Sequence, residues 1–195
     1  MKKLLLYLFV FLGFTNVAYA DAFVYLKSNG FLANSILNNS AALGTSVTKN
    51  NIYILTEDKK IKHCDIYGLN CSVIDNFNHA SPETLSFNDN GDGVVGVSDH
   101  NKGLAIYRQN QFVGYASDQF GKGVRSVSQT NNAIYVINRF NELWKCDTNG
   151  VNCREISTYT NETNSTLSFN NDGNGVIGTS TVSDPHPVPD PVPIQ

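Results

Sequence analysis

An internal repeat of 82 residues constrains this chain more than any other feature of its sequence. The repeat relates the following pairs of segments: Ile52-Tyr53 and Ile134-Tyr135, Cys64-Asp65 and Cys146-Asp147, Gly68-Leu69-Asn70-Cys71 and Gly150-Val151-Asn152-Cys153, Leu85-Ser86-Phe87-Asn88 and Leu167-Ser168-Phe169-Asn170, and Gly93-Val94-Val95-Gly96 and Gly175-Val176-Ile177-Gly178. The offset holds over this stretch without a gap. Both copies are therefore expected to fold into the same structural unit.

The N-terminal segment follows the same pattern. Val24-Tyr25 lies 82 residues before Ile106-Tyr107, and Phe31-Leu32 matches Phe112-Val113 after a shift of one residue. The repeat therefore covers nearly the whole chain between its two ends.

The local sequence predicts strands throughout. Short runs rich in Val, Ile, Tyr, Phe and Thr alternate with clusters of Asn, Gly and Asp, a pattern typical of strands joined by tight turns. The expected strands are 22–27, 31–36, 45–48, 51–56, 60–65, 71–75, 84–88, 93–98, 103–108, 111–116, 124–129, 133–138, 142–147, 152–157, 165–170 and 175–180. No stretch shows sustained helical periodicity, so the fold class is all-β.

The strands group into fours. Segment 127–136 resembles segment 86–96, about 40 residues earlier, and a four-stranded unit of that length resembles the blade of a β-propeller. This resemblance implies a four-bladed propeller with blades near 43–78, 84–118 and 124–160. The fourth blade would combine 22–36 with 165–180, so that pairing of the N- and C-terminal strands closes the ring. The alternatives are a β-sandwich or barrel of the same strands, and a partial ring completed by oligomerisation.

The two ends differ from the repeat. Residues 1–20 have the order of a secretory signal peptide, with Lys2 and Lys3 before an apolar run and then Ala18-Tyr19-Ala20. The apolar run of about 11 residues is shorter than the ~20 that a membrane-spanning helix needs. We therefore expect no membrane span, a repeat domain over 21–181 that is secreted or periplasmic, and a flexible Pro-rich tail over 182–195.

The charge of the mature chain disfavours nucleic acid as a partner. Removing Lys2 and Lys3 from the 14 basic residues leaves 12 against 17 acidic residues, a formal charge of -5. Binding to a phosphate backbone needs clustered basic residues.

Four cysteines recur with the repeat, as Cys64-x6-Cys71 and Cys146-x6-Cys153. An even number of cysteines in an exported protein indicates disulfides, and the repeat favours pairing within each copy. The alternative is a zinc site built from all four, but the Cys-x2-Cys spacing typical of such sites is missing.

One Asn/Asp/Gly-rich loop has the spacing of a calcium-binding loop. Asn88, Asn90, Asp92 and Asp99 match oxygen-ligand positions 1, 3, 5 and 12 of an EF-hand loop. Gly93 occupies position 6, where that loop has a glycine. The alternative is a tight turn between two strands, because Asn-Gly and Asp-Gly accept positive φ. The turn is the preferred interpretation, and calcium is the one cofactor that the sequence brings into question.

The sequence contains no motif of a known catalytic class, neither Gly-x-Ser-x-Gly, His-Glu-x-x-His nor a phosphate-binding Gly loop. We therefore expect a non-catalytic exported binding module whose ligand is a glycan or an extracellular protein. Trp144 is the aromatic residue expected to be partly exposed and to contact the ligand. The alternatives are a structural or envelope-associated interaction protein and a hydrolase with an unrecognised site. A duplicated unit duplicates its surface, which favours two equivalent sites.

Overall fold

Strands make up every regular element in the part of the chain that the structure describes. The computed structural model describes residues 22–27, 30–36, 41–78, 81–98, 102–116, 120, 123–158 and 162–181. The sixteen strands are β1 (Ala22–Lys27), β2 (Gly30–Ile36), β3 (Ala42–Val47), β4 (Asn51–Thr56), β5 (Lys60–Asp65), β6 (Ser72–Asn76), β7 (Pro82–Phe87), β8 (Gly93–Val97), β9 (Leu104–Arg108), β10 (Gln111–Ala116), β11 (Val124–Gln129), β12 (Ile134–Asn138), β13 (Glu142–Cys146), β14 (Arg154–Thr158), β15 (Glu162–Phe169) and β16 (Gly175–Thr181). Their ends lie within three residues of the predicted ones, which confirms the all-β class. Within these ranges no helix is long and apolar enough to span a membrane.

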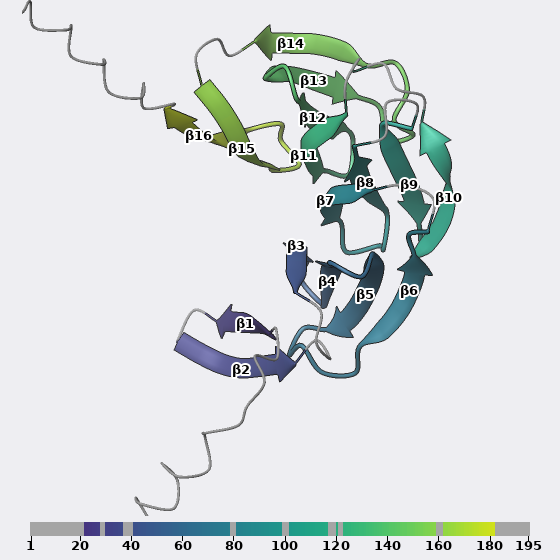
Figure 1. Ribbon diagram of the computed structural model, residues 1–195, viewed down its shortest axis with the longest axis vertical. Coiled ribbons are helices and arrows are strands. Elements are labelled where there is room, and N and C mark those ends of the chain that lie inside the picture. Colours follow the sequence, from purple (N-terminus) through teal and green to yellow (C-terminus); the bar gives the residue numbers. More distant parts are fainter. Residues whose placement is uncertain are drawn as a thin grey trace, which may run out of the picture. The chain divides into compact units, whose positions relative to one another are not determined.

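The chain divides into two compact units, residues 1–79 and 80–195. The first unit holds the hairpin β1-β2 and the four-stranded sheet β3-β4-β5-β6. The second unit holds the sheets β7-β8-β9-β10 and β11-β12-β13-β14 and the hairpin β15-β16 (Figure 1). Each sheet consists of consecutive antiparallel strands, as propeller blades do. The two hairpins form separate two-stranded sheets, so closure of the ring remains a prediction.

One hairpin turn recurs along the chain and explains its Asn, Asp and Gly clusters. In the β7–β8 turn, Asn88 Oδ1 accepts hydrogen bonds from the amides of Asn90 and Asp92, both at 3.0 Å. The Asn88 carbonyl accepts a third bond from Gly91, whose φ of 76° suits glycine. The same bonding pattern begins at four other residues: Asp65, Asn138, Asp147 and Asn170. In each of these turns, a short polar side chain accepts hydrogen bonds from two backbone amides that would otherwise lack a partner.

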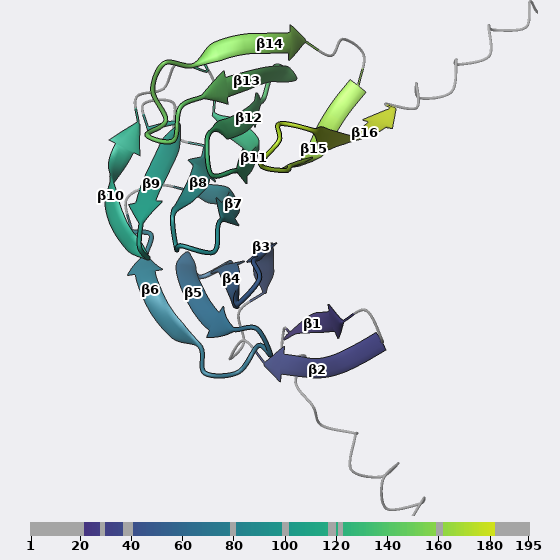
Figure 2. The same ribbon diagram turned by 180° about the vertical axis from the view of Figure 1, so that it is seen from behind.

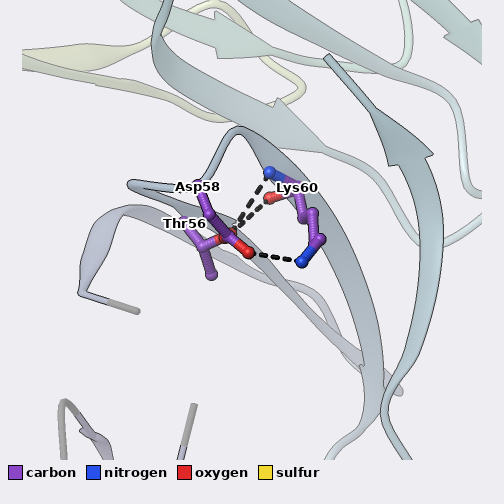
Figure 3. Close-up of polar contacts among 3 residues, drawn as sticks. All are labelled: Thr56, Asp58 and Lys60. Carbon is purple, nitrogen blue, oxygen red and sulfur yellow. Dashed lines mark hydrogen bonds and ion pairs between the residues drawn. The ribbon is translucent and has the colours of Figure 1, made fainter. Parts of the chain in front are cut away.

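The β4–β5 turn builds the same shape with a threonine (Figure 3). Thr56 is the repeat counterpart of Asn138, and its Oγ1 accepts a hydrogen bond from the Lys60 amide at 3.2 Å. The same hydroxyl lies 2.6 Å from Asp58 Oδ1, and Asp58 pairs with Lys60 Nζ at 2.5 Å. Lys59 takes the positive φ, at 60°. The backbone shape is therefore kept although the side chains of the two copies differ.

Strand pairing corrects the repeat offset of the N-terminal hairpin. In β9-β10, Phe112 pairs with Tyr107 and a bulge follows at Val113. In β1-β2, Phe31 pairs with Leu26, and the next pair skips one residue in the same way. The hairpin therefore matches β9-β10 at an offset of 81 throughout. The match of Val24-Tyr25 to Ile106-Tyr107 at an offset of 82 is therefore wrong by one residue. A pair of residues is too short a match to distinguish an offset of 82 from one of 81.

The core of the second unit lies between neighbouring blades. Val94, Leu104 and Ile106 from the sheet β7–β10 pack in one cluster with Ile134 and Val136 from the sheet β11–β14. All five residues of β12 are buried, because the sheet β7–β10 packs on one side of this strand and the hairpin β15-β16 on the other. This covering of both faces explains why the central strands are almost continuously apolar.

Serine side chains connect the first strands of successive blades. β7 and β11 lie side by side, as do β11 and β15 (Figures 1 and 2). The Gln129 amide donates to Ser86 Oγ at 2.8 Å, and the Phe169 amide donates to Ser128 Oγ at 2.8 Å. Within the second unit, the steps from β7 to β11 and from β11 to β15 are therefore made by the same kind of hydrogen bond.

Candidate functional site

Both predicted disulfides form. Cys64 is bonded to Cys71 between β5 and β6, and Cys146 is bonded to Cys153 between β13 and β14. Among the described residues no free cysteine remains, so the structure does not contain the four-thiolate zinc site. Each bond closes a loop at the same place in the two copies.

The polar residues repeated in these loops hold the loops together. Asn70 Nδ2 donates to Asp65 Oδ2 at 2.7 Å, and Asn152 Nδ2 donates to Asp147 Oδ2 at 2.9 Å. Asn70 and Asn152 both take positive φ, at 46° and 53°. Their repetition at 82 residues is thus explained by the loop's own construction and is no sign of a ligand.

Asp65 is stabilised in its charged form by this loop. Desolvation acts to raise its pKa, but hydrogen bonds from the Leu69 amide, the Asn70 side chain and the Tyr67 amide outweigh it. The pKa of the Asp65 carboxyl therefore lies below its ordinary value.

His63 on β5 lies in the first unit against an aromatic ring. Its Nε2 lies 2.9 Å from Asn51 Oδ1, and its ring stacks on Tyr53 with centroids 5.0 Å apart. Desolvation lowers the pKa of His63 below 6.5, because burial disfavours the charged imidazolium. Lys145 occupies the equivalent position of the second copy.

The proposed calcium ligands Asn88, Asn90 and Asp92 lie in the β7–β8 turn, and Asp99 lies outside the described residues. Asn88 Oδ1 already accepts two backbone hydrogen bonds, and Asp92 Oδ1 accepts one from the Gln109 amide at 3.2 Å. Within the described part of the chain, no three His, Cys, Asp or Glu side chains form a group that could hold a metal. The turn interpretation accounts for the position of each described residue.

Trp144 on β13 is half-buried, as its predicted partial exposure requires. Its ring meets Phe120 edge-on with centroids 5.8 Å apart, and its Nε1 donates to Glu142 Oε2 at 3.3 Å. The side chain also packs on the core between the blades. Much of this indole is therefore engaged within the protein.

A pocket lies where the second disulfide loop meets the neighbouring blade, within the second unit. Gly150 at the tip of the loop approaches the blade so closely that an added Cβ would lie 2.7 Å from Ala116 Cβ and 3.0 Å from Ile106 Cδ1. Beside this contact is a cavity of about 260 Å³. Ile106, Ala116 and Val151 form part of its apolar wall.

A strand glycine leaves this pocket open. Gly114 pairs with Ile106 across β9-β10 just after the bulge at Val113, and an added Cβ would meet nothing within 4 Å. The bulge turns Val113 outward, where it is 63% exposed, and Phe112 is 43% exposed. The pocket therefore opens onto an exposed apolar rim.

Arg108 bounds the pocket at its polar end. Its Nη1 donates to the Tyr107 carbonyl at 2.9 Å, and its Nη2 donates to Asn149 Oδ1 at 3.1 Å and to the Thr148 carbonyl. Arg108 thus joins β9 to the disulfide loop. The ion pairs of the described residues, Lys60 with Asp58 and Arg139 with Glu83, do not include Arg108.

None of the pocket residues was predicted to form a site, and Ile106, Val113 and Val151 drew attention only as members of the repeat. An isolated glycine inside a strand is a signal for a bulge, and Gly114 carries that signal. The partner loop, however, begins 33 residues later, and only the packing of two blades brings it beside Gly114.

Comparisons with known proteins identify the fold class. No protein-family model matches the chain, and no curated protein matches its sequence. Among solved structures, a chain of a nidogen–laminin complex has a TM-score of 0.60 at 13% identity, over 75% of this chain and 61% of that one. A Bacteroides caccae protein of unknown function has a TM-score of 0.57 at 10% identity, over 83% and 62%. The computationally designed Ika8 protein has 0.54 at 16%, over 78% and 50%.

The structural neighbours are β-propeller proteins, and this chain has their blades. It spans about three fifths of the nidogen and Bacteroides chains and half of Ika8. At these identities the likeness shows the fold alone.

Proposed function

We propose that this protein is an exported, non-catalytic binding module whose ligand is an extracellular or envelope polypeptide. The observation that carries the proposal is the pocket beside Gly114, an apolar cavity with an exposed apolar rim between β9-β10 of one blade and the disulfide loop of the next. Exposed apolar surface around a cavity is typical of a site that another molecule covers.

A polypeptide suits this pocket better than a glycan. Ile106, Val113 and Val151 make its wall mainly aliphatic. The one aromatic lining residue, Tyr115, already contacts Phe112 and Lys102, whereas sugar recognition uses exposed aromatic faces with polar groups around them. The aromatic residue chosen from the sequence, Trp144, is engaged with Phe120 and Glu142. A chain of similar fold, YCF48, has been solved bound to a D1 peptide, with a TM-score of 0.50 and 16% identity over 77% of this chain and 50% of that one. That structure supports a peptide as ligand for a fold of this kind and carries no residue over.

Export is part of this proposal, as the two disulfides would persist in an exported protein. The signal sequence over 1–20 lies outside the described residues, so the support comes from the two disulfides. Such bonds persist in oxidising compartments. The expected location is therefore the periplasm or the exterior of the cell.

We also propose that the chain forms a closed four-bladed ring. Ser46 on β3 and Ser168 on β15 occupy the positions that Ser128 and Ser86 hold in the other two blades. Repetition of the two inter-blade bonds would pair Ser46 Oγ with the Phe87 amide and Ser168 Oγ with the Val47 amide. Four serines and four amides then form one cycle, and this cycle requires four blades.

The fourth blade has a defined register under this proposal. In the complete blade, Val94 pairs with Ile106 across β8 and β9 and is fully buried. Its counterpart Val176 on β16 is 71% exposed. With the offset of 81 for the N-terminal hairpin, the missing partner of Val176 is Tyr25. Covering an exposed valine supports pairing between β16 and β1.

Engineered disulfides test the closure and its register. Directly paired residues lie within disulfide range, so Tyr25→Cys with Val176→Cys is expected to cross-link within one chain. The matched control is Val24→Cys with Val176→Cys, whose side chains would point to opposite faces. Peptide mapping under non-reducing conditions identifies the bonds. Cross-linking of neither pair would refute closure, preference for the control pair would refute the register, and cross-links between chains would indicate a ring completed by oligomerisation.

Selection of peptide ligands tests the function. The oxidised chain 21–195 is used to select peptides from a displayed library, and the bound peptides are tested against Val151→Glu, which places a charge in the pocket wall. Ile156→Glu is the control, because Ile156 is similarly exposed, at 43%, on β14 outside the pocket. Loss of binding in the first variant alone is expected. Binding that survives it, or specific binding on a glycan array instead, would contradict the proposal.

A further inference from the structure

The pocket beside Gly114 combines a small apolar space with a single cation. Its volume of about 260 Å³ is below the roughly 300–1,000 Å³ of pockets for drug-sized ligands. The space therefore suits one aliphatic side chain. Gly114 provides that space, because any side chain at this position would extend into it.

The cation at its polar end is fixed in position and has no acidic partner among the described residues. Arg108 is held by three acceptors on two elements, the Tyr107 and Thr148 carbonyls and Asn149 Oδ1, and all three are uncharged. A guanidinium has five N–H donors, so two remain after these bonds within the described part of the chain. The two that remain are Nε–H and one N–H of Nη1, on different edges of the guanidinium, and each can donate a charge-assisted hydrogen bond to a carboxylate.

We propose that this pocket binds the C-terminal aliphatic residue of a partner polypeptide, with the side chain beside Gly114 and the terminal carboxylate on Arg108. The inference rests on the proposed function and adds the chemistry of the ligand. A C-terminal Leu, Ile or Val carries an aliphatic group and a carboxylate on one residue, which matches a site with room for a single side chain. Capture of a terminal carboxylate is a known mode of peptide recognition.

The test uses N-acetyl-leucine as the probe and N-acetyl-leucinamide as its neutral match. Each is titrated into the oxidised chain 21–195 while the backbone amide signals of Gly114, Tyr115 and Ala116 are followed by NMR. We expect saturable shifts with the acid and at least about tenfold weaker binding of the amide, because only the acid forms charge-assisted bonds with Arg108. Arg108→Gln is expected to reduce the affinity for the acid by a similar factor. Arg154→Gln is the control, because it removes an exposed arginine of β14 outside the pocket.

Each outcome decides the inference. Equal affinity for acid and amide would overturn it, as would shifts that do not saturate or an Arg108→Gln variant that binds the acid normally. The comparison of N-acetyl-leucine with N-acetyl-leucinamide uses the wild-type protein, so it tests the inference even if the Arg108→Gln variant does not fold. If library peptides bind at Val151 without any need for a free C-terminus, the proposed function stands and this inference fails. If no peptide binds the pocket and N-acetyl-leucine does not either, both fail.

Discussion

The side chain of Asn138 should be among the most important polar groups for stability in the second unit. It is fully buried at the end of β12. Its Oδ1 accepts hydrogen bonds from the Phe140 and Glu142 amides at 2.9 and 3.0 Å, and its Nδ2 donates to the Phe120 carbonyl at 2.9 Å and to Glu142 Oε2 at 2.6 Å. Asn138→Ala removes all four bonds and leaves the buried Phe120 carbonyl without this donor.

The size of the effect follows from burial. A typical hydrogen bond contributes about 1 kcal/mol net, and a buried group left unsatisfied costs about 1–3 kcal/mol. Asn138→Ala should therefore lower the free energy of unfolding by about 3–5 kcal/mol. The matched control is Asn88→Ala, which removes the same two turn bonds from a half-buried position where water can replace them. Its expected loss is about 1 kcal/mol.

Urea unfolding followed by tryptophan fluorescence measures both losses. Trp144 is the single tryptophan of the chain and bonds to Glu142, so its emission reports the region around Asn138. With a slope near 2 kcal/mol per molar urea, the midpoint should fall by about 1.5–2.5 M for Asn138→Ala and by about 0.5 M for Asn88→Ala. Equal midpoint shifts for the two variants would refute the argument that burial determines how much this turn contributes to the free energy of unfolding.

Three further effects follow from the structure. Gly93→Ala places a Cβ 2.3 Å from the Phe87 ring, so it should destabilise the second unit by about 1–3 kcal/mol in the same assay; a loss below about 0.5 kcal/mol would mean that the ring moves aside freely. Replacing Cys146 and Cys153 together by Ala frees a short loop of the unfolded chain and should cost about 2–3 kcal/mol, whereas an unchanged midpoint would contradict that account. His63 has a lowered pKa in the folded state, so the unfolded chain binds a proton first and stability should fall as the pH drops below 6.5 toward that lower pKa. Comparison of wild type with His63→Gln at pH 7.5 and 5.5 by circular dichroism checks this, and an identical pH dependence would count against it.

Local signals were sufficient for the strands and the disulfides. Each cysteine pair is separated by seven residues, and the turn residues act on amides two and four positions away. The pairing of Cys64 with Cys71 could therefore be derived from spacing and symmetry. The offset of the N-terminal hairpin could not, because the bulge after Phe31 is a property of strand pairing and leaves only a shift of one residue in the sequence.

The pocket was beyond sequence reasoning for a different reason. Arg108 and Asn149 meet only because one blade packs on the next, and nothing near either residue indicates the other. Trp144 shows the same limit from the other side: a rare aromatic residue near a turn is predicted to contact a ligand, and only the structure shows that much of its indole packs within the protein. Composition identifies which residues could bind, whereas packing decides which of them remain available.

The differences between the two copies argue for one binding site in place of two. The turn-forming residues Asp147 and Asn152 have identical counterparts in the first copy, where Asp65 and Asn70 form the same hydrogen bond. Asn149 and Val151, which face the pocket, are replaced there by Tyr67 and Leu69. Tyrosine cannot reproduce the amide oxygen that accepts from Arg108. The hydrogen bonds that build the loop are therefore shared by the two copies, whereas the groups that shape the pocket differ, and a ligand that depends on Arg108 and Asn149 should bind once per chain.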